Sequence, residues 1–267
     1  MKYIKLKEVC MINMGQSPDS SSYNEKKEGI PFYQGNADFG EKYPITRVWC
    51  NTPIKIAQSG DILISVRAPI GALNYAKEEC CIGRGLAAIT PDKEKMSLEF
   101  VYWFLKGKNL ELNRKGTGST FKAISRKVLE EIMIPDINLK KQCEYANVLE
   151  KIHAAIQMRK QELKHLDFLL KARFVEMFGD PVANEMGWDT LPLENACKAI
   201  VDCPHSTPSY TKEDTGFRCI RTSIVKKNRI LWDEIEYIPE DEYVKRIQRK
   251  KPDVGDIVYT REGFYDN

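Results

Sequence analysis

Residues 137–177 read INLKKQCEYANVLEKIHAAIQMRKQELKHLDFLLKARFVEM, and this stretch decides the fold. When the stretch is divided into heptads, one position is apolar in every repeat from residue 149 onward: Leu149, Ile156, Leu163, Leu170 and Met177. The companion position carries Ile152 and Leu166, with Arg159 and Arg173 as polar breaks. Such a narrow stripe is typical of a coiled-coil seam, whereas a helix on a globular core has a broader apolar face. We expect a spacer helix with a helical partner; the alternative is a helix lying across one large domain.

The ends of this helix are also marked in the sequence. No proline or glycine occurs between Lys140 and Phe178. Gly179 then supplies a C-cap, and Pro181 prevents continuation. At ~1.5 Å per residue the helix would be on the order of 55–60 Å long. We therefore expect a spacer at residues 137–180 between globular segments at 1–136 and 181–267.

Composition indicates an ordinary globular protein of 267 residues, 42% hydrophobic and 30% charged. No apolar segment approaches the ~20 residues that cross a membrane, and no signal peptide is present, so a cytoplasmic location is expected. The eight cysteines show no C-x-x-C spacing and are expected to be reduced and mostly buried. Cys197, Cys203 and His205 lack a fourth ligand, so neither a metal nor a cofactor is predicted.

The net charge of +3 is distributed unevenly along the chain. Residues 1–136 carry 20 Lys and Arg against 16 Asp and Glu, residues 137–180 carry 8 against 6, and residues 181–267 carry 13 against 16. The first segment is therefore mildly basic. That balance is compatible with a DNA-binding surface but is far from the excess that would identify one.

Strands and short helices follow one another in the first segment without regular alternation. Apolar runs bounded by turn residues predict strands within 30–36, 61–67, 72–76 and 80–90, the second and third as a hairpin. Helical spacing predicts helices within 97–110 and 126–131, the latter capped by Ser125. This order indicates an α+β domain with a twisted sheet rather than a doubly wound fold.

After Pro181 the chain repeats the pattern of its beginning. Residues 188–197 resemble 3–10, residues 216–221 take the place of 29–34, and residues 253–261 resemble 58–67, in the same order. Repetition of this kind indicates a second copy of the first domain. The copy includes a second Gly-Asp strand but no counterpart of the later strands, so an incomplete domain is expected at 181–267.

Several short motifs together resemble the specificity subunits of type I restriction–modification systems. They are residues 60–65 (GDILIS), residues 118–125 (GSTFKAIS), Ile134-Pro135 at the entry to the helix, and residues 177–181 (MFGDP). Each motif is weak alone, whereas their order and spacing are specific. Together with the internal repeat, the motifs span nearly the whole chain. The resemblance implies two target-recognition domains that each read half of a split DNA sequence, held apart by two long antiparallel helices. It also implies a non-catalytic subunit that recruits methyltransferase subunits and the restriction (motor-nuclease) subunit to double-stranded DNA.

The chain is shorter than this pattern requires. The end of the second recognition domain and the second long helix are expected to be missing, as in a chain truncated within its second recognition domain. A second copy running antiparallel would supply the missing helix, so we expect a homodimer. The predicted interface residues are Leu149, Ile152, Ile156, Leu163, Leu166 and Leu170.

Candidate DNA-binding residues lie at the polar ends of the predicted strands. Base readout uses Arg or Lys toward guanine and Asn or Gln toward adenine. The residues that offer these groups are Gln34, Asn36, Arg67 and Arg84. In and after the glycine-rich loop, Ser119, Thr120 and Lys122 are expected to hold phosphate. The alternative is structural: Arg67 or Arg84 pairs with an acidic neighbour, and the loop only shapes a turn.

Catalytic motifs are absent from the sequence. It contains no G-x-x-x-x-G-K-[S/T] loop, no G-x-S-x-G turn and no H-E-x-x-H pair. Asp180-Pro181-Val182 does not supply the Asn/Asp-Pro-Pro-aromatic motif of a DNA methyltransferase. We therefore predict a non-enzymatic subunit. Two alternatives stay open: the recognition fragment of a fused restriction or methylation enzyme, and a coiled-coil scaffold without a DNA role.

Overall fold

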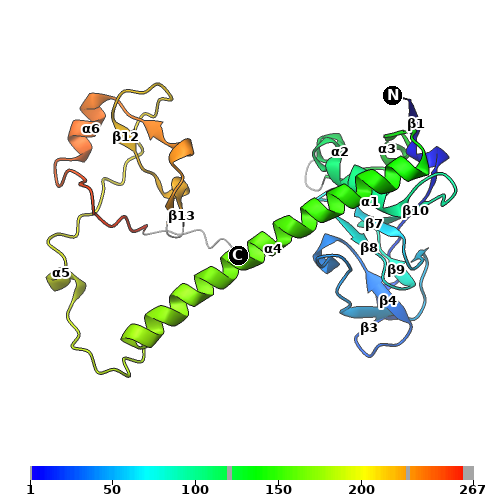
Figure 1. The fold of residues 1–267 in the computed structure, drawn as a ribbon, viewed down its shortest axis with the longest axis horizontal. Helices are drawn as coiled ribbons and strands as arrows, with labels where there is room; N and C mark the ends of the chain where they lie inside the picture. Colours follow the sequence, from blue (N-terminus) through cyan, green and yellow to red (C-terminus); the bar gives the residue numbers. More distant parts are fainter. Residues whose placement is uncertain (1, 119–121, 227–228, 261–267) are drawn as a thin grey trace. The chain divides into compact units, whose positions relative to one another are not determined.

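The computed structural model describes residues 2–118, 122–226 and 229–260 of the chain. It contains two compact units, Met1–Phe174 and Val175–Asn267, and the helix α4 (Leu139–Phe178) runs from the first into the second (Figure 1). Strands, short helices and one long helix occur without regular alternation, which confirms the expected α+β class. Within the described residues, no helix combines the length and the apolar character needed to span a bilayer.

An antiparallel four-stranded sheet, in the order β2-β10-β7-β8, forms the centre of the first unit. Its strands are β2 (Cys10–Met14), β7 (Ile62–Ser65), β8 (Leu73–Tyr75) and β10 (Leu86–Pro91). All four residues of β7 are buried, because this inner strand meets core side chains on both faces. The predicted hairpin is confirmed, with Ile62 opposite Tyr75.

A second sheet of five strands has the order β3-β5-β4-β9-β6. Its strands are β3 (Tyr23–Asn24), β4 (Ile30–Tyr33), β5 (Val48–Cys50), β6 (Ile56–Ala57) and β9 (Cys80–Ile82). Strands β4 and β9 are parallel, and the other pairs are antiparallel. The two sheets share a buried cluster that includes Tyr33, Leu63 and Leu86.

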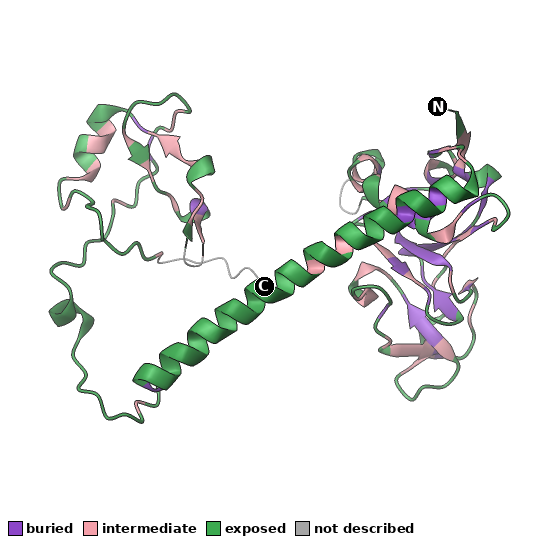
Figure 2. Cartoon of the chain, in the orientation of Figure 1, coloured by how far each residue is buried: buried purple, intermediate pink, exposed green. Residues whose placement is uncertain are grey.

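Short helices pack against the four-stranded sheet and complete the main core. They are α1 (Leu98–Gly107), α2 (Asn109–Lys115) and α3 (Arg126–Glu130), with the 3₁₀ turn η1 (Leu6–Glu8). Two further 3₁₀ turns, η2 (Ser20–Ser22) and η3 (Asn36–Asp38), lie next to strands of the five-stranded sheet. The core contains Ile64 and Ile89 from the sheet and Val101 and Leu105 from α1. Strand β1 (Tyr3–Lys5) pairs with β11 (Met133–Pro135), so the start of the unit lies beside the entry to α4. Figure 2 shows the buried residues gathered in the sheets.

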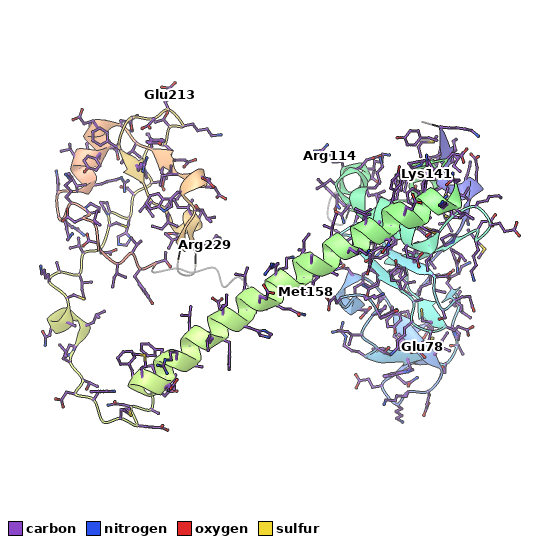
Figure 3. The ribbon with its side chains drawn as sticks, viewed as in Figure 1. Glu78, Arg114, Lys141, Met158, Glu213 and Arg229 are labelled. Carbon is purple, nitrogen blue, oxygen red and sulfur yellow. The ribbon has the colours of Figure 1, made fainter. Side chains whose placement is uncertain are left out.

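The long helix α4 lies within the stretch 137–180 where the sequence predicts a helix. At its start the Asn138 side-chain oxygen accepts the N–H of Lys141 at 2.9 Å. At its end Gly179 has a φ of +76°, a left-handed conformation that glycine adopts without steric cost. Beyond its first turns the helix is exposed along its length (Figure 2), and Met158 projects from its middle (Figure 3).

The first turns of α4 are anchored on the first unit by Gln142, which is completely buried. Its side-chain oxygen accepts the N–H of Ser97 at 2.8 Å. Its Nε2 donates to the carbonyl oxygens of Lys95 at 2.9 Å and Ile137 at 2.7 Å. Ala146, one turn later, is also buried. The helix is therefore part of the first unit's core at its start and separates from it further on.

The second unit consists of short elements. They are α5 (Leu193–Ala196), β12 (Arg218–Cys219), η4 (Thr222–Ile224), β13 (Val225–Lys226), β14 (Arg229–Ile230), η5 (Trp232–Glu234), β15 (Glu236–Tyr237) and α6 (Glu240–Arg246). Its strand pairing follows that of the first unit in the same register. In each unit one residue pairs with residues on both sides: Trp49 with Asn24 and Pro31 in the first, and Tyr237 with Thr211 and Arg218 in the second. The internal repeat in the sequence is thus matched by backbone pairing.

One expected element of the second unit is not formed. Its Gly-Asp segment begins with the same turn as the first unit: the N–H of Asp253 donates to Asp256 Oδ2 at 2.9 Å, as the N–H of Gln58 does to Asp61 Oδ2 at 2.8 Å. Residues 256–260 nevertheless form no strand and are largely exposed, so this prediction is wrong. In the first unit β7 is paired by β8 and β10, and the described part of the second unit has no counterpart of either.

Candidate nucleic-acid interface

Four segments that are far apart in the sequence end along one rim of the first unit. The N–H of Gly85 donates to the carbonyl oxygen of Gln34 at 3.1 Å, and the N–H of Val66 donates to that of Gly85 at 2.8 Å. The N–H of Ile124 donates to the carbonyl oxygen of Val66 at 2.9 Å. Segments joined in this way lie ~4.8 Å apart, so the four span about 14 Å. We call residues 34–36, 66–68, 84–85 and 122–124 the polar rim.

The predicted DNA-binding side chains that the structure describes all belong to the polar rim. They are Gln34 and Asn36 after β4, Arg67 after β7, Arg84 between β9 and β10, and Lys122 after the glycine-rich loop. Asn36 is half-buried and the other four are exposed. None of the five side chains makes a hydrogen bond or an ion pair with any described residue. The ion pairs that the structural alternative requires of Arg67 and Arg84 are therefore not formed in this part of the chain.

The predicted phosphate-binding residues Ser119 and Thr120 lie outside the described residues. The backbone on either side of them is fixed at the rim. Thr117 and Ala123 exchange hydrogen bonds of 3.0 and 2.9 Å. The N–H of Ala68 donates to the carbonyl oxygen of Lys122 at 3.0 Å. The glycine-rich loop therefore starts and ends beside the segment that carries Arg67.

Asp38 and Arg47 hold the loop that carries Gln34 and Asn36, and the sequence reasoning did not identify them. Asp38 Oδ2 accepts the N–H groups of Gln34 at 2.7 Å and Gly35 at 3.2 Å. Asp38 Oδ1 accepts a hydrogen bond from Arg47 Nη2 at 3.0 Å. An aspartate that caps a nearby turn is a local signal that sequence reading can find. The pairing with Arg47 depends on the path of the intervening chain and has no such signal.

The loop that carries Arg84 is held on both sides. A Cβ atom at Gly85 would lie 2.3 Å from the carbonyl oxygen of Gln34, so only glycine permits this close approach. On the other side, the N–H of Arg84 donates to Ser17 Oγ at 3.2 Å. Because the backbone is fixed, the side chain of Arg84 alone is free to adjust to a ligand.

All six residues predicted to form the partner face of α4 are exposed. Their exposed fractions are 41% for Leu149, 52% for Ile152, 47% for Ile156, 64% for Leu163, 56% for Leu166 and 70% for Leu170. Within the described part of the first unit, no other helix approaches this length. The seam is therefore available to a partner.

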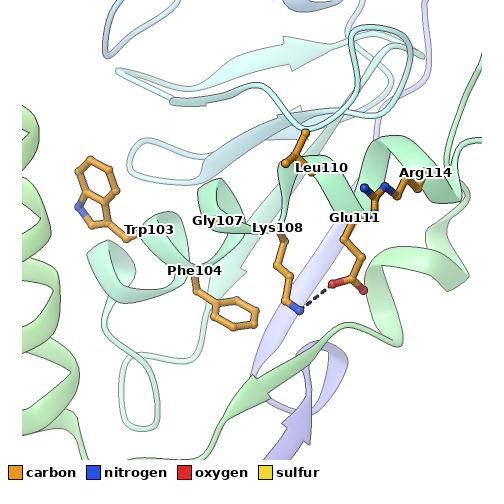
Figure 4. Close-up of a pocket in the computed structure, with 7 residues that line it drawn as sticks. All are labelled: Trp103, Phe104, Gly107, Lys108, Leu110, Glu111 and Arg114. Carbon is orange, nitrogen blue, oxygen red and sulfur yellow. Dashed lines mark hydrogen bonds and ion pairs between the residues drawn. The ribbon is translucent and has the colours of Figure 1, made fainter. Parts of the chain in front are cut away.

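A shallow groove of about 590 Å³ lies on the surface of α1 and α2 (Figure 4). It is lined by Trp103, Phe104, Gly107, Lys108, Leu110, Glu111 and Arg114. Hydrogen bonds from Lys108 at 2.6 Å and Lys115 at 2.7 Å lower the pKa of Glu111 to about 2. Trp103 also packs edge-on against His153 of α4, so this ring supports the helix. No residue of the polar rim lines the groove.

Comparison with known proteins points to one family. The model of the type I restriction modification DNA specificity domain matches residues 1–167. The putative type I restriction enzyme MjaX specificity subunit of Methanocaldococcus jannaschii is 45% identical over 156 residues, which cover 58% of this chain and 37% of that protein. The type I restriction enzyme MjaIX specificity subunit of the same organism is 30% identical over 136 residues, covering 49% and 31%.

Solved structures agree with this assignment. A chain from a study of complex assembly and conformational transition of the type I R-M system matches with a TM-score of 0.60 at 41% identity, covering 64% of this chain and 43% of that one. The HsdS subunit from Thermoanaerobacter tengcongensis matches with a TM-score of 0.56 at 41% identity. The match covers 60% of this chain and 39% of that one.

This chain spans less than half the length of these relatives. Because they are specificity subunits and components of type I systems, a fused enzyme and a scaffold without a DNA role are not favoured. The resemblance found in the sequence is confirmed: the chain belongs to the type I restriction modification DNA specificity domain family.

Proposed function

We propose that this chain recognises a double-stranded DNA sequence for the other subunits of a type I restriction–modification system. The observation that carries the proposal is the polar rim, where three cations and two amides stand without partners in the described chain on loops fixed by backbone hydrogen bonds. Base readout requires Arg, Gln and Asn side chains that offer free hydrogen-bond donors and acceptors from a rigid frame. The rim's extent of about 14 Å is also close to the ~12 Å width of the major groove.

Each rim residue has a chemical role in this proposal. Gln34 and Asn36 are suited to pair with adenine, and Arg67 and Arg84 with guanine or phosphate. Lys122, with Ser119 and Thr120, is suited to hold phosphate. Residues 1–136 then act as the first recognition domain, residues 137–180 as the spacer, and residues 181–267 as part of a second recognition domain.

The chain is proposed to be non-catalytic and to act through partners. It would recruit methyltransferase subunits and, within the full complex, the restriction subunit, in the cytoplasm where the DNA lies. A second copy packed antiparallel on the exposed seam of α4 would give a homodimer, with Arg159 and Arg173 setting the register. Two copies of the rim would then face a bipartite target.

Binding to duplex DNA at rising salt concentration tests the proposal. We expect the logarithm of the binding constant to fall steeply with the logarithm of salt, because several phosphates would be neutralised. Selection from a random duplex pool should also enrich one sequence pattern. Co-expression with the methyltransferase subunits should place methyl groups within that pattern. Equal binding to all duplexes at every salt concentration, or none to any, would contradict the proposal.

A further inference from the structure

The second unit presents an arginine at the position that Gln34 holds in the first. Pro31 and Arg218 are equivalent strand residues. Pro31 pairs with Trp49 in the first unit, and Arg218 pairs with Tyr237, the equivalent residue, in the second. Gln34 lies three residues after Pro31, and Arg221 lies three residues after Arg218. A 3₁₀ turn follows in both units, although η3 begins two residues after Gln34 and η4 begins one residue after Arg221. The two side chains therefore leave the chain at matching points of the repeat.

Arg221 is held by an aromatic ring and a carboxylate. The guanidinium carbon lies 5.5 Å from the centre of the Tyr210 ring. Tyr210 is the counterpart of Tyr23. Tyr23 precedes Asn24, which pairs with Trp49, and Tyr210 precedes Thr211, which pairs with Tyr237. The Nη1 atom of Arg221 lies 2.9 Å from Glu236 Oε2. These contacts order a long side chain before any ligand arrives, which lowers the entropy cost of binding.

The same contacts leave bonding capacity unused. The Nε atom of Arg221 and the Oε2 atom of Glu236 are buried and have no hydrogen-bond partner among the described residues, so the ion pair is close but poorly aligned. The buried Nε is not open to an outside ligand, and any further bonds must come from the terminal Nη1 and Nη2 atoms. The side chain of Arg221 is 39% exposed. A guanidinium carries several N–H donors in a planar fork, and one carboxylate engages only part of it. The N–H groups of Nη1 and Nη2 that Glu236 does not engage can bind an acceptor pair outside the unit.

We propose that Arg221 is a specificity-determining residue that reads guanine for the second unit, at the position where Gln34 reads a base for the first. The inference rests on the proposed DNA recognition and adds which residue and which base the second unit uses. A guanidinium fork matches the O6 and N7 acceptors of guanine, whereas a glutamine amide matches the N6 donor and N7 acceptor of adenine. The two units therefore prefer different bases at equivalent points of the target.

Selection from a duplex library with a randomised centre, using the full chain, tests this inference. Arg221→Gln should change the selected base at one position from guanine to adenine. Arg221→Lys retains the charge and the ion pair with Glu236 but loses the fork. Its preference for guanine over adenine should fall on the order of tenfold to a hundredfold. Gln34→Arg should produce the opposite change, from adenine to guanine, at a different position.

Arg229, an exposed arginine on β14 of the same unit, provides the matched control (Figure 3). Arg229→Ala should leave the selected pattern unchanged, because the inference assigns Arg229 no contact with a base, and the loss of a charge near phosphates would weaken binding equally for all sequences. If Arg221 only pairs with Glu236, Arg221→Lys will keep the guanine preference, and the inference is overturned. If the library in that experiment is still enriched at the base positions read by the first unit, the proposed DNA recognition is retained. A wild-type chain that enriches no duplex would instead overturn the proposed function.

Discussion

The side-chain oxygen of Gln142 lies 2.8 Å from the backbone nitrogen of Ser97 and accepts its hydrogen bond. Ser97 is the N-cap of α1, so this bond joins the first turns of the long helix to the start of a core helix. The amide nitrogen of Gln142 makes two further bonds to backbone carbonyls. The long helix is therefore fixed to the first unit by a buried polar residue with all its groups satisfied, which restricts its direction more than apolar contact alone.

Replacement of this glutamine should destabilise the first unit. Gln142→Leu keeps a side chain of similar size but leaves the N–H of Ser97 and two carbonyl oxygens without their partner. We expect the free energy of unfolding to fall by about 1–3 kcal/mol, measured by urea denaturation. Gln161→Ala, an exposed substitution on the same helix, should change it by less than about 0.5 kcal/mol. Equal effects of the two variants would show that Gln142 is no anchor.

Loss of a rim cation should reduce the salt dependence of DNA binding. For each of Arg67→Ala, Arg84→Ala and Lys122→Ala, the slope of log affinity against log salt should become shallower by about 1 if a phosphate contact is lost. Lys77→Ala is the matched control, since Lys77 follows β8 at the end of the hairpin away from Arg67. A slope that changes as much for Lys77→Ala as for the rim variants would argue against the rim.

A charge placed in the seam of α4 should prevent self-association. Leu163→Glu puts a carboxylate on a face that the proposed dimer buries, and sedimentation should show a dimer-to-monomer change. The unfolding free energy of the first unit should stay the same, because Leu163 is 64% exposed in the single chain. Lys164→Glu introduces the same group beside the seam and should leave the dimer intact. A wild-type chain that is strictly monomeric at micromolar concentration would rule out the dimer.

Thiol reactivity should divide the cysteines into two groups. All eight are free; the exposed ones are Cys143, Cys197 and Cys203, and the buried ones are Cys10, Cys50, Cys80 and Cys81, with Cys219 between. The expectation of mostly buried cysteines thus holds for only half of them. Burial raises the pKa of Cys10 and Cys80 to about 12, which suppresses the reactive thiolate. Iodoacetamide labelling of the native chain should modify the three exposed residues first, and all eight only in denaturant.

The Glu111 carboxylate should contribute stability that depends on pH. Its hydrogen bonds from Lys108 and Lys115 lower its pKa from 4.5 to about 2. Because the pKa is lower in the folded protein than in the unfolded chain, the ionised carboxylate stabilises the folded protein at pH values above 4.5. This contribution is lost as the pH falls from 4.5 toward about 2. Glu111→Gln should therefore lower the melting temperature slightly at neutral pH, and the difference should vanish near pH 2. The effect is small because the group is partly exposed.

Features set by local sequence could be predicted. The heptad pattern, the absence of proline and glycine, and Gly179 at the end are local signals, and α4 lies within the predicted stretch. The hairpin of β7 and β8 also depends on neighbouring residues. By contrast, the parallel pairing of β4 with β9 joins residues about fifty positions apart, and no local pattern specifies it. From the sequence, Gln142 is expected to be an exposed helix residue, because two of its three partners, Ser97 and Lys95, come from a distant segment.

The same distinction explains the rim and the missing strand. Residue chemistry singled out Gln34, Arg67, Arg84 and Lys122, but their alignment depends on backbone bonds between distant segments. Residues 256–260 have the sequence of a strand, yet a strand also needs neighbours to accept its hydrogen bonds. The described part of the second unit does not provide them. Local pattern therefore predicts which residues matter better than it predicts where they meet.

The bonds that align the polar rim run from main chain to main chain. The five polar side chains, Gln34, Asn36, Arg67, Arg84 and Lys122, make no hydrogen bond or ion pair that holds these loops to the rest of the described chain. Natural variants could therefore exchange one amide or guanidinium for another and acquire a new preferred sequence while the architecture beneath stays intact. Such a module is inherently evolvable, because selection for a different target does not compete with selection for a folded protein.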